Sequence, residues 1–226
     1  MKRTYLFFLC LFLMALTEIS AQTIPVNKRF GKVSREELEL SSYDLDTAAT
    51  ALILYENKWT AIHLNAADAF TQTTRTHMRI KILKEEGVSW GDFEMICHHS
   101  TKNQESVAGI DVVTYNLVDG KIVETKMPKK YIFTEDFTEN YKKVTFSAQD
   151  VRVGSVIEVK FDRIDTRYWN LPDIYFQKNI PVNLVECEVR LPEFFTFNKK
   201  MTGYHRVDYA YDEDSGSLQT SNGQYG

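Results

Sequence analysis

The chain has 226 residues, of which 43% are hydrophobic and 26% are charged, and its formal net charge is −4. This length suits one large all-β domain or two small ones, and the apolar fraction is ample for a packed core. A mildly acidic chain whose basic residues occur only as isolated pairs lacks the continuous basic surface that nucleic-acid binding requires.

Residues 1–21 have the layout of a secretory signal peptide. Two basic residues precede an apolar run from Tyr5 to Leu16, and small residues end the segment at Ala21. The run is too short to span a bilayer comfortably, although an uncleaved anchor is the alternative. Cys10 is not preceded by the small residues of a lipoprotein signal. We therefore expect an exported protein, periplasmic, secreted or on the cell surface, whose residues 22–226 form one domain that is not integral to the membrane.

The first predicted element after the leader is a short helix. Ser34 is followed three residues later by Glu37, the spacing of a capping box, and the helix would end at Leu40. It is the only helix of note that the sequence predicts. From Ala51 onward the patterns are those of strands.

Strand patterns then follow one another to the end of the chain. Apolar and polar side chains alternate through residues 77–82, which predicts a strand with one buried and one solvated face. Asp119 and Gly120 form a dipeptide suited to a tight hairpin turn, because both positions tolerate positive φ. Further strands are predicted over 142–147, 152–163, 184–191 and 207–211, and Gly154 and Ser155 are interpreted as a bend.

About ten strands with short turns predict a large antiparallel β-sandwich with one short N-terminal helix, because a flat sheet of that size would leave an apolar face in water. Asn222 and Gly223 form another hairpin signal, with almost no residues left for the second strand. We therefore expect the domain to be truncated at its C-terminus.

Two cysteines follow the leader, Cys97 and Cys187. In an oxidising compartment they could form one disulfide. The alternating pattern favours a different interpretation, in which both are small hydrophobic residues of the core.

Three groups of residues have side chains that could form a chemical site. Cys97, His98 and His99 are consecutive, but on a strand only the first and third share a face, whereas a closed zinc site needs four ligands. Cys187, His205 and Asp208 have the residue types of a nucleophilic triad, yet a cysteine in mid-strand lacks the cation or helix N-terminus that activates a thiol. The carboxylates are interpreted as outward faces of strands, for example Glu158 between Ile157 and Val159. We expect no catalytic residues, no metal site and no cofactor.

An aromatic loop between two predicted strands is the remaining candidate site. Tyr168, Trp169, Tyr175 and Phe176 lie in a stretch interrupted by prolines. Burial is the usual fate of such side chains. Exposed members would instead contact a neighbouring domain or stack on sugar rings, and the domain contact is preferred.

The stretch 151–197 and four earlier ones, 34–46, 51–56, 79–95 and 114–133, together resemble a known family. The chain resembles the domain of unknown function that precedes a transglutaminase-like core in secreted and envelope proteins of Gram-negative bacteria. The resemblance implies an extracytoplasmic β-rich module, commonly followed by a papain-like fold with a Cys, His and Asp triad. We expect this chain to stop before any such core.

The function expected from the sequence is therefore that of a non-catalytic scaffold or interaction module. Its partner would be a C-terminal transglutaminase-like domain or another envelope protein, and the parent protein could be a transglutaminase-like or peptidase-like enzyme. The alternative is a stand-alone glycan-binding β-sandwich. An enzyme acting through Cys187 is the third and weakest option.

Overall fold

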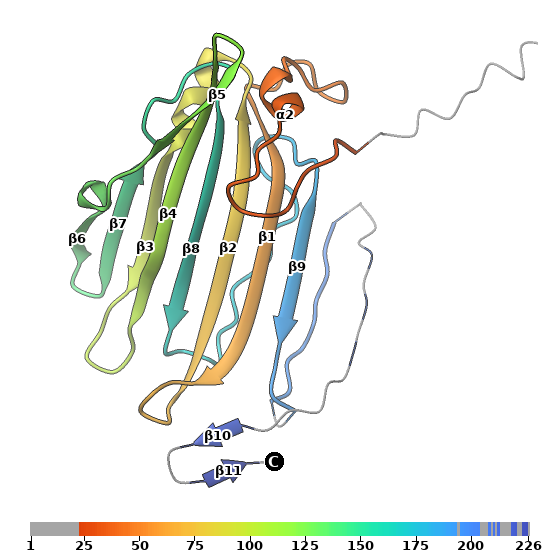
Figure 1. Cartoon of the computed structure of the whole chain (residues 1–226). Helices are drawn as coiled ribbons and strands as arrows, with labels where there is room; N and C mark the ends of the chain where they lie inside the picture. The colour runs from red at the N-terminus through yellow and green to blue at the C-terminus, as the bar shows by residue number, and fades with distance from the viewer. Residues whose placement is uncertain are drawn as a thin grey trace, which may run out of the picture.

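The protein is a β-sandwich built from two sheets of unequal size (Figure 1). The computed structural model describes residues 23–193, 195–203, 208, 210, 212, 218–220 and 223–225. Strands dominate these residues, and one short α-helix lies near the N-terminus. The predicted fold class is therefore confirmed.

The large sheet has six strands in the order β5 (Lys121–Lys126), β4 (Glu105–Val118), β8 (Val156–Asp165), β2 (Phe70–Ile82), β1 (Ala51–Leu64) and β9 (Val185–Arg190). The small sheet has the order β3 (Asp92–His98), β7 (Tyr141–Ser147) and β6 (Phe133–Thr138). A separate hairpin joins β10 (Leu218–Thr220) to β11 (Gly223–Tyr225). Neighbouring strands are antiparallel except for β1 and β9, which are parallel.

The helical elements of the described residues are short. They are α2 (Arg35–Glu39) and two 3₁₀ turns, η1 (Glu85–Gly91) and η2 (Lys129–Tyr131). The predicted capping box is confirmed, because the Ser34 hydroxyl accepts from the Glu37 amide while the Glu37 carboxylate accepts from the Ser34 amide. None of the described helices is long and apolar enough to span a bilayer.

The turn predicted at Asp119 and Gly120 is confirmed, whereas the strand predicted from residue 152 begins later. Asp119 and Gly120 have φ of 50° and 73° and connect β4 to β5 as a tight hairpin. Gly154 has φ of 90°, so the turn it makes delays the start of β8 to Val156 rather than the predicted residue 152. The hairpin predicted from Asn222 and Gly223 is present, but Gly223 begins β11 and pairs with Thr220, and Asn222 lies outside the described residues. The strand predicted over 207–211 lies largely outside the described residues, as does the whole leader.

One face of the six-stranded sheet, here called the core face, packs against the second layer. It carries aliphatic side chains such as Ile53, Ile80 and Ile157, which are almost completely buried. The small sheet covers this face over β4 and β8. The loop 166–184 crosses it beside β1 and β2, and contributes the buried Ile180.

The opposite face, here called the strap face, is covered near one end by residues 23–50, the N-terminal segment (Figure 1). Leu52, Leu54 and Tyr115 are buried beneath it together with Leu38 of α2. A bulge between Ile53 and Tyr55 reverses the alternation of β1. Tyr55 therefore lies on the strap face, where it reaches His77.

The expectation of a solvated face on β2 and β8 is wrong at this end of the sheet. Arg79, Lys81 and Glu158 are each 0% exposed. The interpretation of the carboxylates as outward faces also fails for Glu56, which is buried on the core face, where it pairs with Lys178 of the loop 166–184. The alternation identified the two faces correctly, but the N-terminal segment removes the polar one from water.

Candidate interaction site

The loop 166–184 holds the four predicted aromatic residues and is attached to the core face by polar side chains. The Gln72 amide donates to the carbonyl oxygens of Arg167 and Asn170, at 3.1 and 2.8 Å. The Lys178 ammonium forms an ion pair with the buried Glu56 carboxylate, at 3.2 Å. These contacts position the backbone of the loop, so its exposed side chains are presented from a fixed support.

Tyr168 and Trp169 lie at the start of this loop. The Tyr168 ring contacts those of Phe70 and Phe195, with centroid distances of 5.5 and 5.4 Å. Trp169 meets the edge of Tyr168 at 5.1 Å and remains 57% exposed. A supported ring with a solvated face is the form in which aromatic side chains contribute most to binding.

Tyr175 and Phe176 lie further along the loop. Tyr175 is 63% exposed and its hydroxyl donates to Asp173, whereas Phe176 is half-buried. The described ring contacts do not join this pair to Tyr168. The structure therefore separates the predicted cluster into two parts, with one strongly exposed ring in each.

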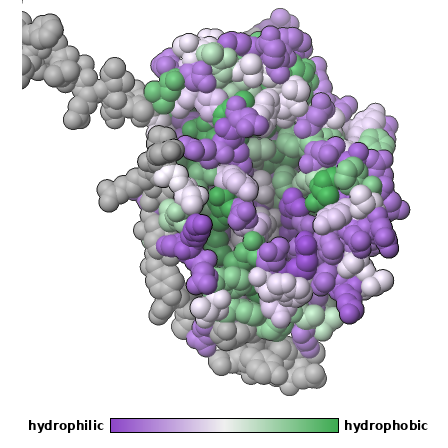
Figure 2. All heavy atoms as spheres, turned by 180° about the vertical axis from the view of Figure 1, so that it is seen from behind, coloured by the Kyte–Doolittle hydropathy of each residue, from purple (hydrophilic) through white to green (hydrophobic). Residues whose placement is uncertain are grey.

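Seen from behind, apolar side chains gather in a band down the middle of the molecule, with hydrophilic residues on either side (Figure 2). This side of the molecule carries the second layer of the sandwich. An apolar band on an otherwise polar surface is typical of an interaction site.

Asn183, at the end of the loop, ties the loop to the N-terminal segment. Its side-chain oxygen accepts from the Ile24 amide at 2.7 Å, while its side-chain nitrogen donates to the carbonyl oxygens of Ile24 and Leu54, both at 3.0 Å. Lys28 also forms an ion pair with Glu186 in β9. The N-terminal segment and the loop are thus attached to each other as well as to the sheet.

A buried ionic cluster beneath the N-terminal segment was not predicted from the sequence. Arg79 donates to Glu37 at 2.7 Å and to Glu158 at 2.5 Å, and all three side chains are at most 1% exposed. Arg79 also donates to the Arg29 carbonyl oxygen. The capping-box Glu37 therefore has two partners, because its other oxygen caps α2 through Ser34.

Glu158 is the centre of this cluster. Besides Arg79 it accepts from the Gly31 amide and the Tyr115 hydroxyl, and it lies 2.8 Å from His77 Nε2. Burial by itself would raise the pKa of Glu158, but the hydrogen bonds from His77 and Arg79 outweigh burial and hold that pKa below its usual value. Burial and the nearby carboxylate raise the pKa of Tyr115. Glu158 is consequently ionised and fully paired.

Lys81 lies beside this cluster without a carboxylate partner. Its ammonium donates to the carbonyl oxygens of Leu38 and Gly154, both at 2.6 Å. Burial lowers the pKa of Lys81 to about 8. Lys81 therefore links α2 to the turn before β8. We interpret the cluster as the attachment of the N-terminal segment rather than as a catalytic site.

The sequence held one signal for this cluster. His77, Arg79 and Lys81 occupy alternate positions of β2, and Glu158 has the complementary charge on a neighbouring strand. What the pattern could not show is that α2, some forty residues earlier, brings Glu37 onto Arg79.

The cysteine and histidine candidates are not assembled into a described site. Cys97 packs in the core with Met95, and Cys187 is half-buried in β9, beside Lys58. Both thiols are free, so the disulfide hypothesis is wrong. Burial raises the pKa of each thiol, which opposes the thiolate that a nucleophile needs.

The histidines add no described site. His205, the proposed base, lies outside the described residues, and Asp208 is exposed. Within the described ranges, three or more His, Cys, Asp or Glu side chains are nowhere grouped so as to hold a metal ion.

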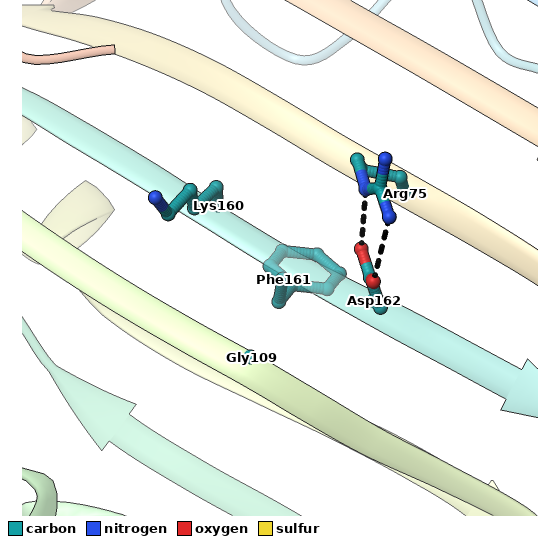
Figure 3. Close-up of a pocket in the computed structure, with 5 residues that line it drawn as sticks. All are labelled: Arg75, Gly109, Lys160, Phe161 and Asp162. Atoms are coloured by element: carbon teal, nitrogen blue, oxygen red, sulfur yellow. Dashed lines mark hydrogen bonds and ion pairs between the residues drawn. The ribbon is translucent and has the colours of Figure 1, made fainter.

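A shallow pocket lies on the exposed part of the large sheet (Figure 3). Arg75 and Asp162 form two hydrogen bonds across it, at 3.0 and 3.2 Å. Lys160 pairs with Asp111 beyond its margin, at 3.4 Å. Because these charged groups already satisfy one another, the pocket is a weaker candidate than the aromatic loop.

Comparison with known proteins identifies a family. Residues 68–219 match the sequence model of the family described as "Domain of Unknown Function with solved-structure structure (DUF3857)". The matched range begins in the turn before β2 and excludes α2 and β1. No curated protein matches the chain.

Among solved structures, the chain is similar to one described as "a putative protease from Parabacteroides distasonis". It is 18% identical with a TM-score of 0.43, and the match covers 64% of this chain and 29% of that chain. This chain thus spans less than a third of the length of that protein, and a likeness this low carries no argument about activity.

Proposed function

The chain belongs to the DUF3857 family, and we propose that it is a non-catalytic module that binds a neighbouring domain. The family match confirms the resemblance found in the sequence. The neighbour is a transglutaminase-like domain, as the resemblance implies, and the contact is made by the aromatic loop. The module acts outside the cytoplasm, in keeping with the leader-like residues 1–21.

The exposure of Trp169 and Tyr175 on an anchored loop is the observation that carries this proposal. Large aromatic rings lose little conformational entropy on binding and bury a large apolar area, so they dominate the energy of protein interfaces. A loop already held by Gln72 and Lys178 adds little ordering cost. The ionic cluster supports the same role, because it fixes the N-terminal segment that the loop contacts through Asn183.

The test is site-specific photo-crosslinking in the native gene product, expressed in its own host. A photoreactive phenylalanine analogue is placed at position 169, at 175, or at 45 as a matched control. Leu45 is 59% exposed, close to the 57% of Trp169, but lies in the N-terminal segment. Positions 169 and 175 should crosslink to a transglutaminase-like domain, and position 45 should not.

A binding measurement complements the crosslinking. Trp169→Ala should weaken association with the crosslinked domain by about tenfold or more, as expected for a central aromatic contact. Leu45→Ala should leave it unchanged. Crosslinks to no such domain, or equal effects of the two substitutions, would refute the proposal.

Glycan binding is the competing outcome. Calorimetric titration with cell-wall and dietary polysaccharides should give no heat if the loop is a domain contact. Heat that disappears in the Trp169→Ala variant would instead establish the loop as a sugar-stacking platform.

A further inference from the structure

The small sheet has a second exposed aromatic region, on the side of the sandwich away from β9 (Figure 1). β6 is an edge strand: it pairs with β7 on one side, and no strand in the described part of the chain pairs with its other side. All six of its residues are exposed, including Phe133 at 59% and Phe137 at 53%. An exposed strand edge carries unpaired backbone donors and acceptors that can bind another strand.

A hollow lies where β6 begins. Phe133 pairs with Thr145, but β7 continues for two residues beyond it, and Phe146 and Ser147 pair only with β3. The chain enters β6 here from η2. The hollow is lined by Tyr131, Phe133, Thr145, Phe146, Ser147 and Gln149. It offers an apolar side chain of a docked strand a place beside the edge.

The register assigns the side chains of β6 to two faces. Residues directly opposite each other in a sheet share a face, so Phe133 lies with Thr145 and Glu135 with Lys143. Lys143 also lies over the Phe137 ring, at 5.6 Å from its centroid, which places this ring on the same face. An apolar, acidic, apolar pattern therefore runs along the outer face of the edge.

The charges on the edge select the kind of strand that can pair with it. β6 carries Glu135 and Asp136 and no basic residue. Glu135 has a partner in Lys143 at 2.7 Å, but the Asp136 side chain is 85% exposed and lies 3.9 Å from Lys142. A second copy of this chain paired antiparallel about these residues would place acidic side chains opposite acidic ones, which is destabilising. The edge thus disfavours its own copy and attracts a basic strand.

From this geometry we infer that β6 binds an extended segment of a partner protein in which two consecutive basic residues lie between apolar residues. The basic pair lies opposite Glu135 and Asp136. The apolar residues lie opposite Phe133 and Phe137, with one of them in the hollow beside Tyr131. This surface is separate from the aromatic loop and does not depend on the function proposed for it.

The test uses the purified chain and a capped peptide, Val-Phe-Thr-Lys-Lys-Phe-Thr-Val, with a control peptide in which both lysines are glutamates. Binding is measured by calorimetry and by amide chemical shifts in NMR spectra. The basic peptide should bind, with shift changes concentrated in residues 133–138 and 145–149. The acidic peptide should bind about tenfold more weakly or not at all.

A charge reversal provides a gain-of-function control. The double variant Glu135→Lys with Asp136→Lys should lose the basic peptide and gain the acidic one, a result that misfolding cannot produce. The matched control reverses the exposed Glu85 and Glu86 of η1 and should bind as the unaltered chain does. Equal binding of both peptides, shift changes away from β6, or dimers of the unaltered chain formed through β6 would each overturn the inference.

Discussion

The two faces of the six-stranded sheet bury their side chains by different physical means, although the same strands supply both. On the core face, aliphatic residues such as Ile80 pack against the small sheet. On the strap face, Arg79, its neighbour in β2, is equally buried but ion-paired to Glu37 and Glu158. Burial of Ile80 needs only apolar area around it, whereas burial of Arg79 needs a partner for every charge.

The two kinds of burial respond differently to a substitution. An apolar contact tolerates small changes of shape, and its loss costs the area and the cavity. A buried ion pair contributes little net stability over a well-packed apolar pair, but losing one partner leaves a buried charge. The strap face therefore fixes where the N-terminal segment lies, and four substitutions test this contrast between the two faces.

The largest effect is expected from Arg79→Ala. It leaves the Glu37 and Glu158 carboxylates buried without their common partner, so the free energy of unfolding should fall by about 3 to 5 kcal/mol. Urea denaturation measures this change. Arg75→Ala, which removes an arginine with an exposed side chain paired to Asp162, should cost no more than about 1 kcal/mol. Similar losses in the two variants would mean that the cluster does not hold the segment.

Ile80→Ala tests the core face at the next residue. Ile80 is 0% exposed, and truncating it removes apolar contact and leaves a cavity, which should cost about 3 kcal/mol. Ile122→Ala in β5, where the side chain is 40% exposed, should cost about 1 kcal/mol or less. Unlike the loss at Arg79, the loss at Ile80 should not vary with pH. A pH-dependent loss at Ile80 would contradict the contrast between the faces.

Lys81 gives the strap face a distinct pH dependence. Its pKa in the folded protein is about 8, below its ordinary value of 10.5, so above pH 8 the unfolded chain binds more protons and stability rises with pH. The rise should reach about 2 kcal/mol by pH 10. Burial and Glu186 raise the pKa of Tyr55 to about 12, so stability falls again above pH 10. Denaturation from pH 7 to 10 should show the rise in the unaltered chain and not in Lys81→Met.

The smallest effect is expected at the helix cap. Ser34→Ala removes the hydroxyl that accepts from the Glu37 amide and should cost about 1 kcal/mol. Ser34→Thr should restore most of this loss, because threonine also caps a helix. Thermal unfolding compares the three proteins, and a loss as large as that of Arg79→Ala would show that the cap, rather than the ion pairs, holds the segment.

Much of the fold could be predicted because its signals are local. The capping box at Ser34 and the Asp119–Gly120 turn depend on residues a few positions apart. The side-chain alternation in β2 separates the two faces correctly. The parallel pairing of β9 with β1 was not predicted, because it joins residues about 130 positions apart and leaves no mark on either strand.

The candidate site was predicted only in part, for a similar reason. The aromatic composition of the loop identified Tyr168, Trp169, Tyr175 and Phe176, but not which of them are exposed. Exposure depends on Phe70 and Phe195, which support Tyr168. The exposed edge of β6 was missed because the sequence shows an ordinary strand, and only the strand order makes it an edge.

The amino-acid sequence by itself determined the β-rich fold class, the short helix that Ser34 caps, the tight turns and the family, because period-two patterning and turn chemistry act over a few residues. The tertiary structure alone decided that Arg79, Lys81 and Glu158 are buried. The same charged strand positions would be solvated or enclosed according to whether a distant segment brings matching charges to them. That choice is made by the docking of α2 and the N-terminal segment, not by the strands themselves.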